Sequence, residues 1–143
     1  MKISTKGRYG LRALIDLGIH CEKGCVSLSD IAQRQDLSLN YLENIFSNLK
    51  RAELVIGTAG AQGGYVLAKS PENITLKEIL SALEGDMSVY DTSGEQTELG
   101  DFLNRNVWDV IDAKVDNILK NTTLQDLLNG IQHKNASADC SKL

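Results

Sequence analysis

The sequence predicts a mainly α-helical fold with one small β-hairpin, and three observations along the chain predict it. A short capped helix and a longer amphipathic helix are separated by about three residues between residues 28 and 51. Two short apolar β-forming runs follow, joined by a glycine-rich turn at residues 60–64. Apolar residues then keep helical spacing through residues 99–121. This order is that of a winged helix-turn-helix with a long C-terminal dimerisation helix added.

The first expected helix, at about residues 5–21, begins in a basic stretch. Cations beside a helix-turn-helix can bind the phosphates that flank a DNA groove. The alternative is a solvated basic helix end. The cations in question are Lys2, Lys6, Arg8 and Arg12.

Two serines predict where the next helices begin. Ser27 with Asp30 resembles a capping box that opens a short helix at residues 28–34, and Ser38 is the expected N-cap of the longer helix. One side of the longer helix is apolar at positions i, i+3, i+4 and i+7, a spacing suited to burial. Its members are Leu42, Ile45, Phe46 and Leu49.

The other side of the longer helix is polar and mostly uncharged, whereas an ordinary solvated face is rich in Lys and Glu. Amides, hydroxyls and a guanidinium can bind base edges and phosphates, so we expect this side to be the recognition face. A plain solvent surface is the alternative. The members of this face are Asn40, Asn44, Ser47 and Arg51, with Tyr41 near the helix start, and Ser38 at the N-cap is also expected to contact DNA.

The expected wing consists of the apolar runs at residues 54–56 and 65–67. The glycines between them permit the positive φ values of a tight hairpin and a close approach to a phosphate, so Gln62 and Gly63 are expected at the DNA. A nucleotide-binding loop is not expected, because no Gly-Lys-Ser/Thr follows and the next element is a strand.

An apolar stripe on the long helix predicts a second copy as its partner. Thr75 with Glu78 caps a preceding helix that Gly85 closes, and the stripe beyond is too long for a small domain to cover. Two-fold symmetry then predicts a pseudo-palindromic operator with half-sites of about 10 base pairs. The expected dimerisation residues are Phe102, Leu103, Val107, Val110, Ile111 and Ile118.

A last short helix is expected at residues 124–129, ending at Gly130. The predicted organisation is a DNA-binding domain at residues 1–85, a loop at 86–98, the dimerisation helix with a short capping helix at 99–130, and a flexible tail at 131–143.

The net charge of the 143 residues is −4, but the charge is unevenly distributed. Residues 1–70 hold nine Lys and Arg against six Asp and Glu, a balance of +3, whereas residues 71–143 hold six against thirteen, a balance of −7. The basic first half is consistent with DNA binding. No apolar run is long enough to span a bilayer and no signal-peptide core is present, so we expect a cytoplasmic protein with no membrane partner.

Other classes of function are less favoured by the sequence. No convergent catalytic set or cofactor motif is visible, so neither an enzyme nor a bound cofactor is expected. A winged helix that docks protein in place of DNA is one alternative, because the net charge is negative. A metal- or cluster-binding sensor, or a redox pair, is another. It would use Cys21, Cys25 and Cys140, which are otherwise thiols outside any disulfide framework.

Three segments in this order resemble the Rrf2 family of bacterial winged-helix repressors, and the resemblance covers nearly the whole chain. Residues 1–10 resemble the family's N-terminal motif, residues 38–49 its recognition helix, and Gly63-Gly64-Tyr65 its wing. The resemblance implies a repressor that binds DNA as a dimer through crossed long helices. It also implies that Tyr41 and Glu43 lie near the bases.

Two departures from the family pattern affect what the resemblance implies. Ala59 stands where many members carry an arginine that enters the minor groove, so readout by the wing is expected to be weaker or carried by Gln62. Members that sense iron-sulphur clusters or nitric oxide carry three cysteines before the long helix, and residues 86–98 contain none. The chain therefore resembles the cluster-free branch that includes a repressor of cysteine metabolism. That branch implies a signal from a protein co-regulator, such as a cysteine-synthesis enzyme, or from thiol oxidation.

Overall fold

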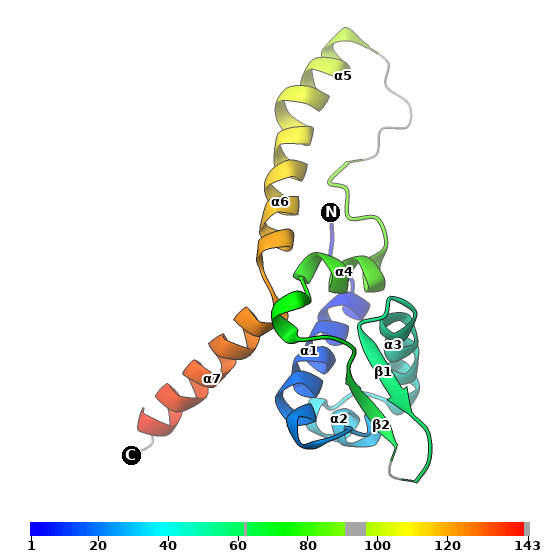
Figure 1. Cartoon of the computed structure of the whole chain (residues 1–143). Helices are drawn as coiled ribbons and strands as arrows, with labels where there is room; N and C mark the ends of the chain where they lie inside the picture. Colours follow the sequence, from blue (N-terminus) through cyan, green and yellow to red (C-terminus); the bar gives the residue numbers. More distant parts are fainter. Residues whose placement is uncertain (62, 91–96, 142–143) are drawn as a thin grey trace.

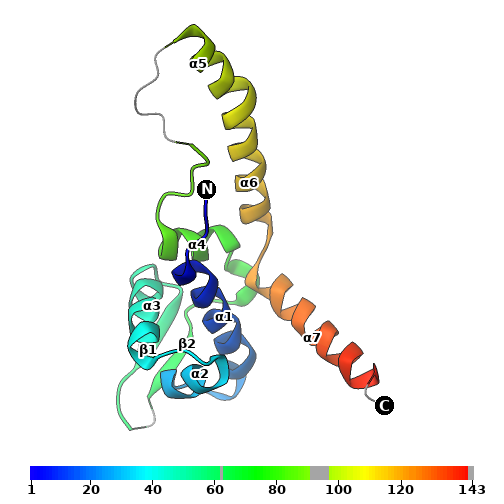
Figure 2. The same ribbon diagram turned by 180° about the vertical axis from the view of Figure 1, so that it is seen from behind.

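A computed structural model describes residues 1–61, 63–90 and 97–141, with side chains up to residue 135. Within these residues, the chain is mainly α-helical, with one antiparallel hairpin at the edge of the helical body (Figures 1 and 2), which confirms the predicted fold class. The hairpin is β1 (Val55–Thr58) and β2 (Gly64–Leu67). The helices are α1 (Thr5–His20), α2 (Leu28–Gln35), α3 (Leu39–Arg51), α4 (Leu76–Glu84), α5 (Glu98–Leu103), α6 (Asp109–Asn121) and α7 (Leu124–Ser141).

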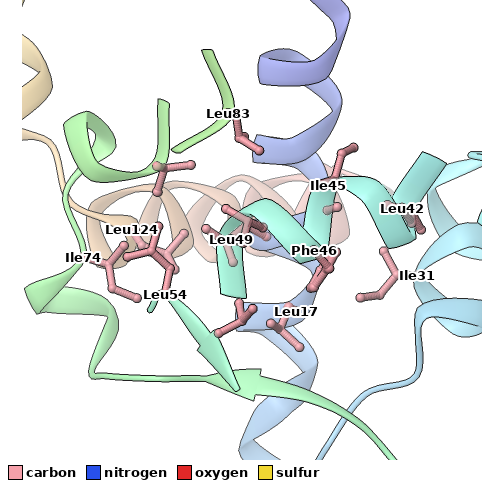
Figure 3. Close-up of a cluster of buried hydrophobic side chains, with 14 of the residues drawn as sticks. Leu17, Ile31, Leu42, Ile45, Phe46, Leu49, Leu54, Ile74, Leu83 and Leu124 are labelled. Carbon is pink, nitrogen blue, oxygen red and sulfur yellow. The ribbon is translucent and has the colours of Figure 1, made fainter. Parts of the chain in front are cut away.

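The core lies where α1, α3 and α4 meet, and the hairpin and the start of α7 close around it (Figure 3). Leu42, Ile45 and Phe46 of α3 have no exposed surface, as the apolar side of this helix predicted. Leu17 of α1 and Ile31 of α2 are equally buried. Burying side chains of this size contributes roughly 1.5–3 kcal/mol each. The position of α3 is therefore fixed by its own inner side.

Local capping explains where α2 and α3 begin and end. The Ser27 hydroxyl accepts a hydrogen bond from the Asp30 N–H at 3.1 Å, and the Ser38 hydroxyl accepts one from the Tyr41 N–H at 3.2 Å, as predicted. Asp36 has a φ of 54° and a ψ of 54°, the left-handed conformation that ends α2. Residues 36–38 therefore form the turn of the helix-turn-helix.

The predicted long helix is a rod that rises from the body of the molecule in Figure 1. It contains a turn of π-helix at Asn104–Trp108, between α5 and α6, that the sequence analysis did not predict. A π turn inserts residues without breaking the helix, so it shifts the apolar stripe around the axis. Among the described residues, no helix is both long and apolar enough to cross a membrane.

The base of the rod is joined to the start of α4 by backbone hydrogen bonds. The Leu76 N–H donates to the Thr122 carbonyl at 2.8 Å, and the Leu124 N–H donates to the Ile74 carbonyl at 2.8 Å. These bonds hold the junction between α6 and α7 against the body.

α7 does not end at Gly130, where the last short helix was expected to end, but continues to Ser141. Gly130 does not adopt the positive φ that would end a helix. A glycine inside a helix costs only about 1 kcal/mol relative to alanine, so it need not stop one. Leu124 and Leu128 belong to the core, so the start of α7 packs with the DNA-binding body and not with the rod.

Candidate nucleic-acid interface

The polar side of α3 is exposed along its length, opposite the buried side. Its amide, hydroxyl, carboxylate and guanidinium groups supply the donors and acceptors that base edges and phosphates require. The exposed residues on this side are Asn40, Glu43, Asn44, Ser47 and Arg51.

Tyr41 is half-buried at the start of α3 and contacts Tyr9 of α1. The two ring centroids are 6.2 Å apart and the rings meet edge to face at 82°. The guanidinium carbons of Arg8 and Arg12 lie 5.8 and 5.2 Å from the centroid of the Tyr9 ring. This contact therefore brings two cations of α1 to the start of α3.

The other predicted cations lie at the same end of α1. Lys2 and Arg8 are exposed, and Lys6 is half-buried. The first turns of α1 thus present a basic surface beside the polar side of α3.

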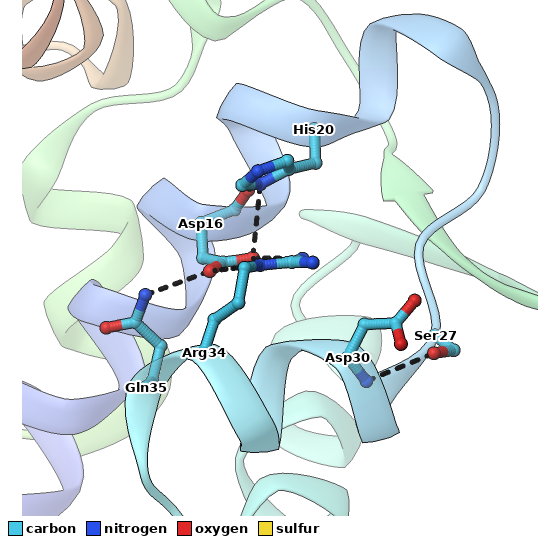
Figure 4. Close-up of polar contacts among 6 residues, drawn as sticks. All are labelled: Asp16, His20, Ser27, Asp30, Arg34 and Gln35. Atoms are coloured by element: carbon cyan, nitrogen blue, oxygen red, sulfur yellow. Dashed lines mark hydrogen bonds and ion pairs between the residues drawn. The ribbon is translucent and has the colours of Figure 1, made fainter.

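A buried carboxylate joins α1 to α2 behind this surface (Figure 4). Asp16 is 2% exposed, and it accepts hydrogen bonds from Arg34 Nη2 at 2.7 Å, Arg34 Nε at 3.0 Å and Gln35 Nε2 at 2.9 Å. Burial alone raises the pKa of Asp16, but these hydrogen bonds and the charges of Arg34 and His20 outweigh it and lower the pKa below its usual value. Arg12 extends the network by donating to the Gln35 carbonyl at 2.6 Å.

The wing is held from two sides. The Val26 N–H donates to the Tyr65 carbonyl at 2.9 Å, and the Tyr65 N–H donates to the Val26 carbonyl at 2.8 Å. A Cβ at Gly64 would lie 2.4 Å from the Val26 carbonyl oxygen, so this approach requires glycine. The Tyr65 ring packs against Phe46 of α3 with centroids 4.9 Å apart. The wing is therefore fixed to α3 and to the segment just before α2.

The residues at the wing tip that were considered as DNA contacts differ in their surroundings. Gly63 is half-buried, and a Cβ there would lie 2.2 Å from the Thr58 carbonyl oxygen, so the hairpin itself requires this glycine. Ala59 is exposed. Gln62 lies outside the described residues.

The predicted dimerisation residues lie along the rod and differ in exposure. The most exposed of them is Ile118 at 61%, followed by Phe102 at 59%. Leu99, next to the predicted set, is 68% exposed. The exposed members are Phe102, Val110, Ile111 and Ile118, and the half-buried ones are Leu103 and Val107.

Two of the three cysteines lie near the end of α1. Cys21 is half-buried in the short turn after the helix. Cys25 is exposed just before Val26, whose backbone is hydrogen-bonded to β2. The side chain of Cys140 lies outside the described residues. Within the described part of the chain, no three His, Cys, Asp or Glu side chains are grouped to hold a metal ion.

The roles of Tyr9, Asp16, Arg34 and Gln35 were not predicted from the sequence. One signal was available: Tyr9, Arg12 and Asp16 recur at i, i+3 and i+7 on α1, which places three polar or aromatic residues on one face of a helix that is otherwise largely apolar. Their partners lie on other helices and are visible only in the folded chain.

The comparisons with known proteins agree with this geometry. Residues 3–130 match the Rrf2 family, described as "Iron-dependent Transcriptional regulator". The chain is 42% identical over 127 residues to the HTH-type transcriptional regulator CymR of Bacillus subtilis, covering 89% of each chain. It is 36% identical over 131 residues to the HTH-type transcriptional regulator IscR of Pectobacterium carotovorum, covering 90% of this chain and 80% of that protein.

The fold is similar to the solved structure of CymR, the global cysteine regulator of B. subtilis. The TM-score is 0.80 at 43% identity, covering 90% of this chain and 97% of that chain. The winged helix-turn-helix fold and these matches together confirm the prediction of a DNA-binding transcriptional regulator. The chain belongs to the Rrf2 family of transcriptional regulators.

Proposed function

We propose that the protein is a homodimeric, sequence-specific repressor that blocks transcription by occupying promoters. The observation that carries the proposal is the exposed polar side of α3 between the basic end of α1 and the wing. In such an arrangement, one helix enters the major groove while the elements beside it contact the flanking backbone.

The proposal divides the interface into base contacts and phosphate contacts. Asn40, Tyr41 and Asn44 lie toward the start of α3, where recognition helices reach base edges, and their side chains can accept and donate hydrogen bonds. Arg8 and Arg51 carry full charges and are assigned to phosphates, which fix the position of the protein without reading sequence.

The exposed apolar side chains of the rod support a second copy as partner. Phe102 and Ile118 each expose more than half of their surface, at 59% and 61%. Apolar surface of this kind marks an interaction site, and a two-fold contact between rods would present two α3 helices to the same face of DNA. The proposed operator therefore has two half-sites about 10 base pairs, or a multiple of that, apart.

The family description names iron, but the residues before the rod do not fit an iron-sulphur cluster. Residues 86–98 supply carboxylates and hydroxyls and contain neither Cys nor His, whereas clusters are held mainly by Cys thiolates. We therefore propose that the signal comes from a protein partner or from a thiol. Metal analysis of protein purified without oxygen tests this: stoichiometric iron would overturn it.

Selection of bound sequences from a random DNA library tests the main proposal, with duplexes about three helical turns long to hold both half-sites. A two-fold symmetric motif is expected. Arg51→Ala should weaken binding to selected and unselected duplexes alike. Asn44→Ala should change which bases are preferred, with a loss of about 1–3 kcal/mol in the discrimination between bases. Glu72→Gln, at an exposed site in the turn before α4, is the matched control. An unchanged base preference in Asn44→Ala would contradict the proposed recognition side.

The same titrations separate DNA binding from protein docking. Phosphate contacts release counterions, so the affinity for DNA must fall steeply with salt. If the library yields no motif and binding does not depend on salt, the winged helix serves another partner.

A further inference from the structure

The carboxylate of Glu84, the last residue of α4, is bonded to the first turn of α1. One oxygen, Oε1, accepts hydrogen bonds from the Ser4 N–H at 2.9 Å, the Ser4 hydroxyl at 2.6 Å and the Gly7 N–H at 3.1 Å. The first N–H groups of a helix have no partner within the helix, and they favour a negative charge. A residue of α4 therefore completes the N-terminus of a helix 77 to 80 positions away.

Two glycines of α1 make room for the end of α4. A Cβ at Gly7 would lie 2.2 Å from Glu84 Oε1, and a Cβ at Gly10 would lie 2.5 Å from Leu83 Cδ1. Neither position has a positive φ, so backbone conformation does not call for glycine there. The close approach of α4 does.

The end of α1 that Glu84 completes is the basic end of the candidate interface. Lys6 and Arg8 lie in its first turns, and Tyr9 follows with its contact to Tyr41 of α3. The position of the first turn of α1 therefore determines where these cations lie relative to the polar side of α3.

Beyond Glu84 the chain is tied to the rod. The Val89 N–H donates to Asp112 Oδ1 of α6 at 2.7 Å, and the Tyr90 hydroxyl donates to Asp109 Oδ1 at 2.8 Å. The α-ammonium group of Met1 reaches the Val89 carbonyl at 3.4 Å. The N-terminal end of α1 thus contacts both α4 and the segment that α6 holds.

We propose that Glu84 is a positioning residue for DNA binding, which holds the basic end of α1 in register with α3 and links that register to the rod. This inference rests on the proposed DNA contacts of α1. Without the carboxylate, the first turn of α1 loses three hydrogen bonds and its cations lose their fixed place beside the DNA backbone.

The test is a salt titration of binding to one duplex of fixed mixed sequence, because phosphate contacts supply non-specific binding and no operator is needed. Glu84→Ala should bind about tenfold more weakly than wild type. The slope of log affinity against log salt should become shallower by roughly 1.8, which corresponds to one lost phosphate contact in each protomer of a dimer. Glu84→Gln keeps an acceptor oxygen and should retain most of the affinity. Glu78→Ala, a carboxylate of the same helix that pairs with Lys69, is the control.

Gly7→Ala gives an independent test that does not remove the carboxylate. Its methyl group displaces the end of a flexible side chain, and the helix propensity of alanine offsets part of the lost capping, so the variant should still fold. It should reproduce the DNA defect of Glu84→Ala, and the double variant should bind no more weakly than Glu84→Ala alone.

The outcomes distinguish this inference from the proposed function. A cap that only stabilises the fold would lower the melting temperature and leave the affinity and salt slope of the folded protein unchanged, and that result would overturn the inference. If wild type itself shows no salt-dependent binding, the proposed DNA contacts fail and the inference fails with them.

Discussion

Replacing Asp16 by asparagine tests whether the buried carboxylate holds the helix-turn-helix together. The substitution keeps the volume of the side chain but removes the negative charge that accepts hydrogen bonds from Arg34 and Gln35. The new side-chain N–H₂ group would also face the N–H donors of Arg34 and Gln35 and could not accept a hydrogen bond from them. Hydrogen bonds to a charged group contribute roughly 1.5–3 kcal/mol each. The asparagine side chain would keep one acceptor oxygen, and Arg34, which is 36% exposed, can turn toward water. We therefore expect the free energy of unfolding to fall by about 2–3 kcal/mol, less than for a fully enclosed ion pair.

Urea unfolding followed by circular dichroism measures this loss, with Glu22→Gln as the control because Glu22 is an exposed acid just after α1. The dependence on pH gives a second check. Because the pKa of Asp16 is lowered in the folded chain, its contribution is complete above the unfolded value of about 3.9 and is lost as the pH falls through the lower folded value. Wild type and Asp16→Asn should thus differ at neutral pH and converge in acid. A difference below about 0.5 kcal/mol at neutral pH would refute the reasoning, since that is the range of ordinary surface substitutions.

Three further changes test the core, the rod and the wing. Leu124→Ala should lower the free energy of unfolding by about 2–5 kcal/mol in urea titrations, because Leu124 is fully buried in the core; a loss typical of a surface site would contradict the packing of α7. Phe102→Asp should give a monomer in sedimentation at concentrations where wild type is a dimer, since a charge would enter the proposed contact between rods; an unchanged mass would place the interface elsewhere. Ala59→Arg should raise the affinity for DNA and steepen the salt slope by roughly 1.8 for two wings in salt titrations, because an exposed arginine there can enter the minor groove; an equal slope would show that this position does not reach DNA.

The elements predicted from the sequence were those with local causes. Ser27, Ser38 and Thr75 each accept a hydrogen bond from the N–H three residues later, as their spacing indicated. The buried side of α3 followed from the period of its apolar residues. Such features depend on a few neighbouring residues, so the sequence displays them directly.

The features that escaped prediction depend on residues distant in the chain or on small energy differences. Gly130 was predicted as a helix end, but α7 passes through it, because a glycine without a positive φ costs a helix only about 1 kcal/mol. The π turn in the rod was not predicted, because Leu103 and Val107 keep the i, i+4 spacing of an ordinary α-helix there. The bond between Glu84 and Gly7 joins positions 77 residues apart, and no local rule connects an acid at the end of one helix with a glycine in another.

The position of α4 limits how a change in the rod can reach DNA. α4 contacts α1 and α3 on one side and α6 on the other, and its two ends are bonded to the rod junction and to α1. Leu83 at its inner side lies close to Gly10, so α4 and α1 are tightly packed there. Packed interiors transmit displacement because they contain little free space. A small rotation of α4 would therefore change the register between the basic end of α1 and the polar side of α3, and the proposed interface requires both to meet the same duplex at once. On the proposed role of Glu84, displacing the cations of α1 relative to α3 would lose phosphate contacts without any separation of domains.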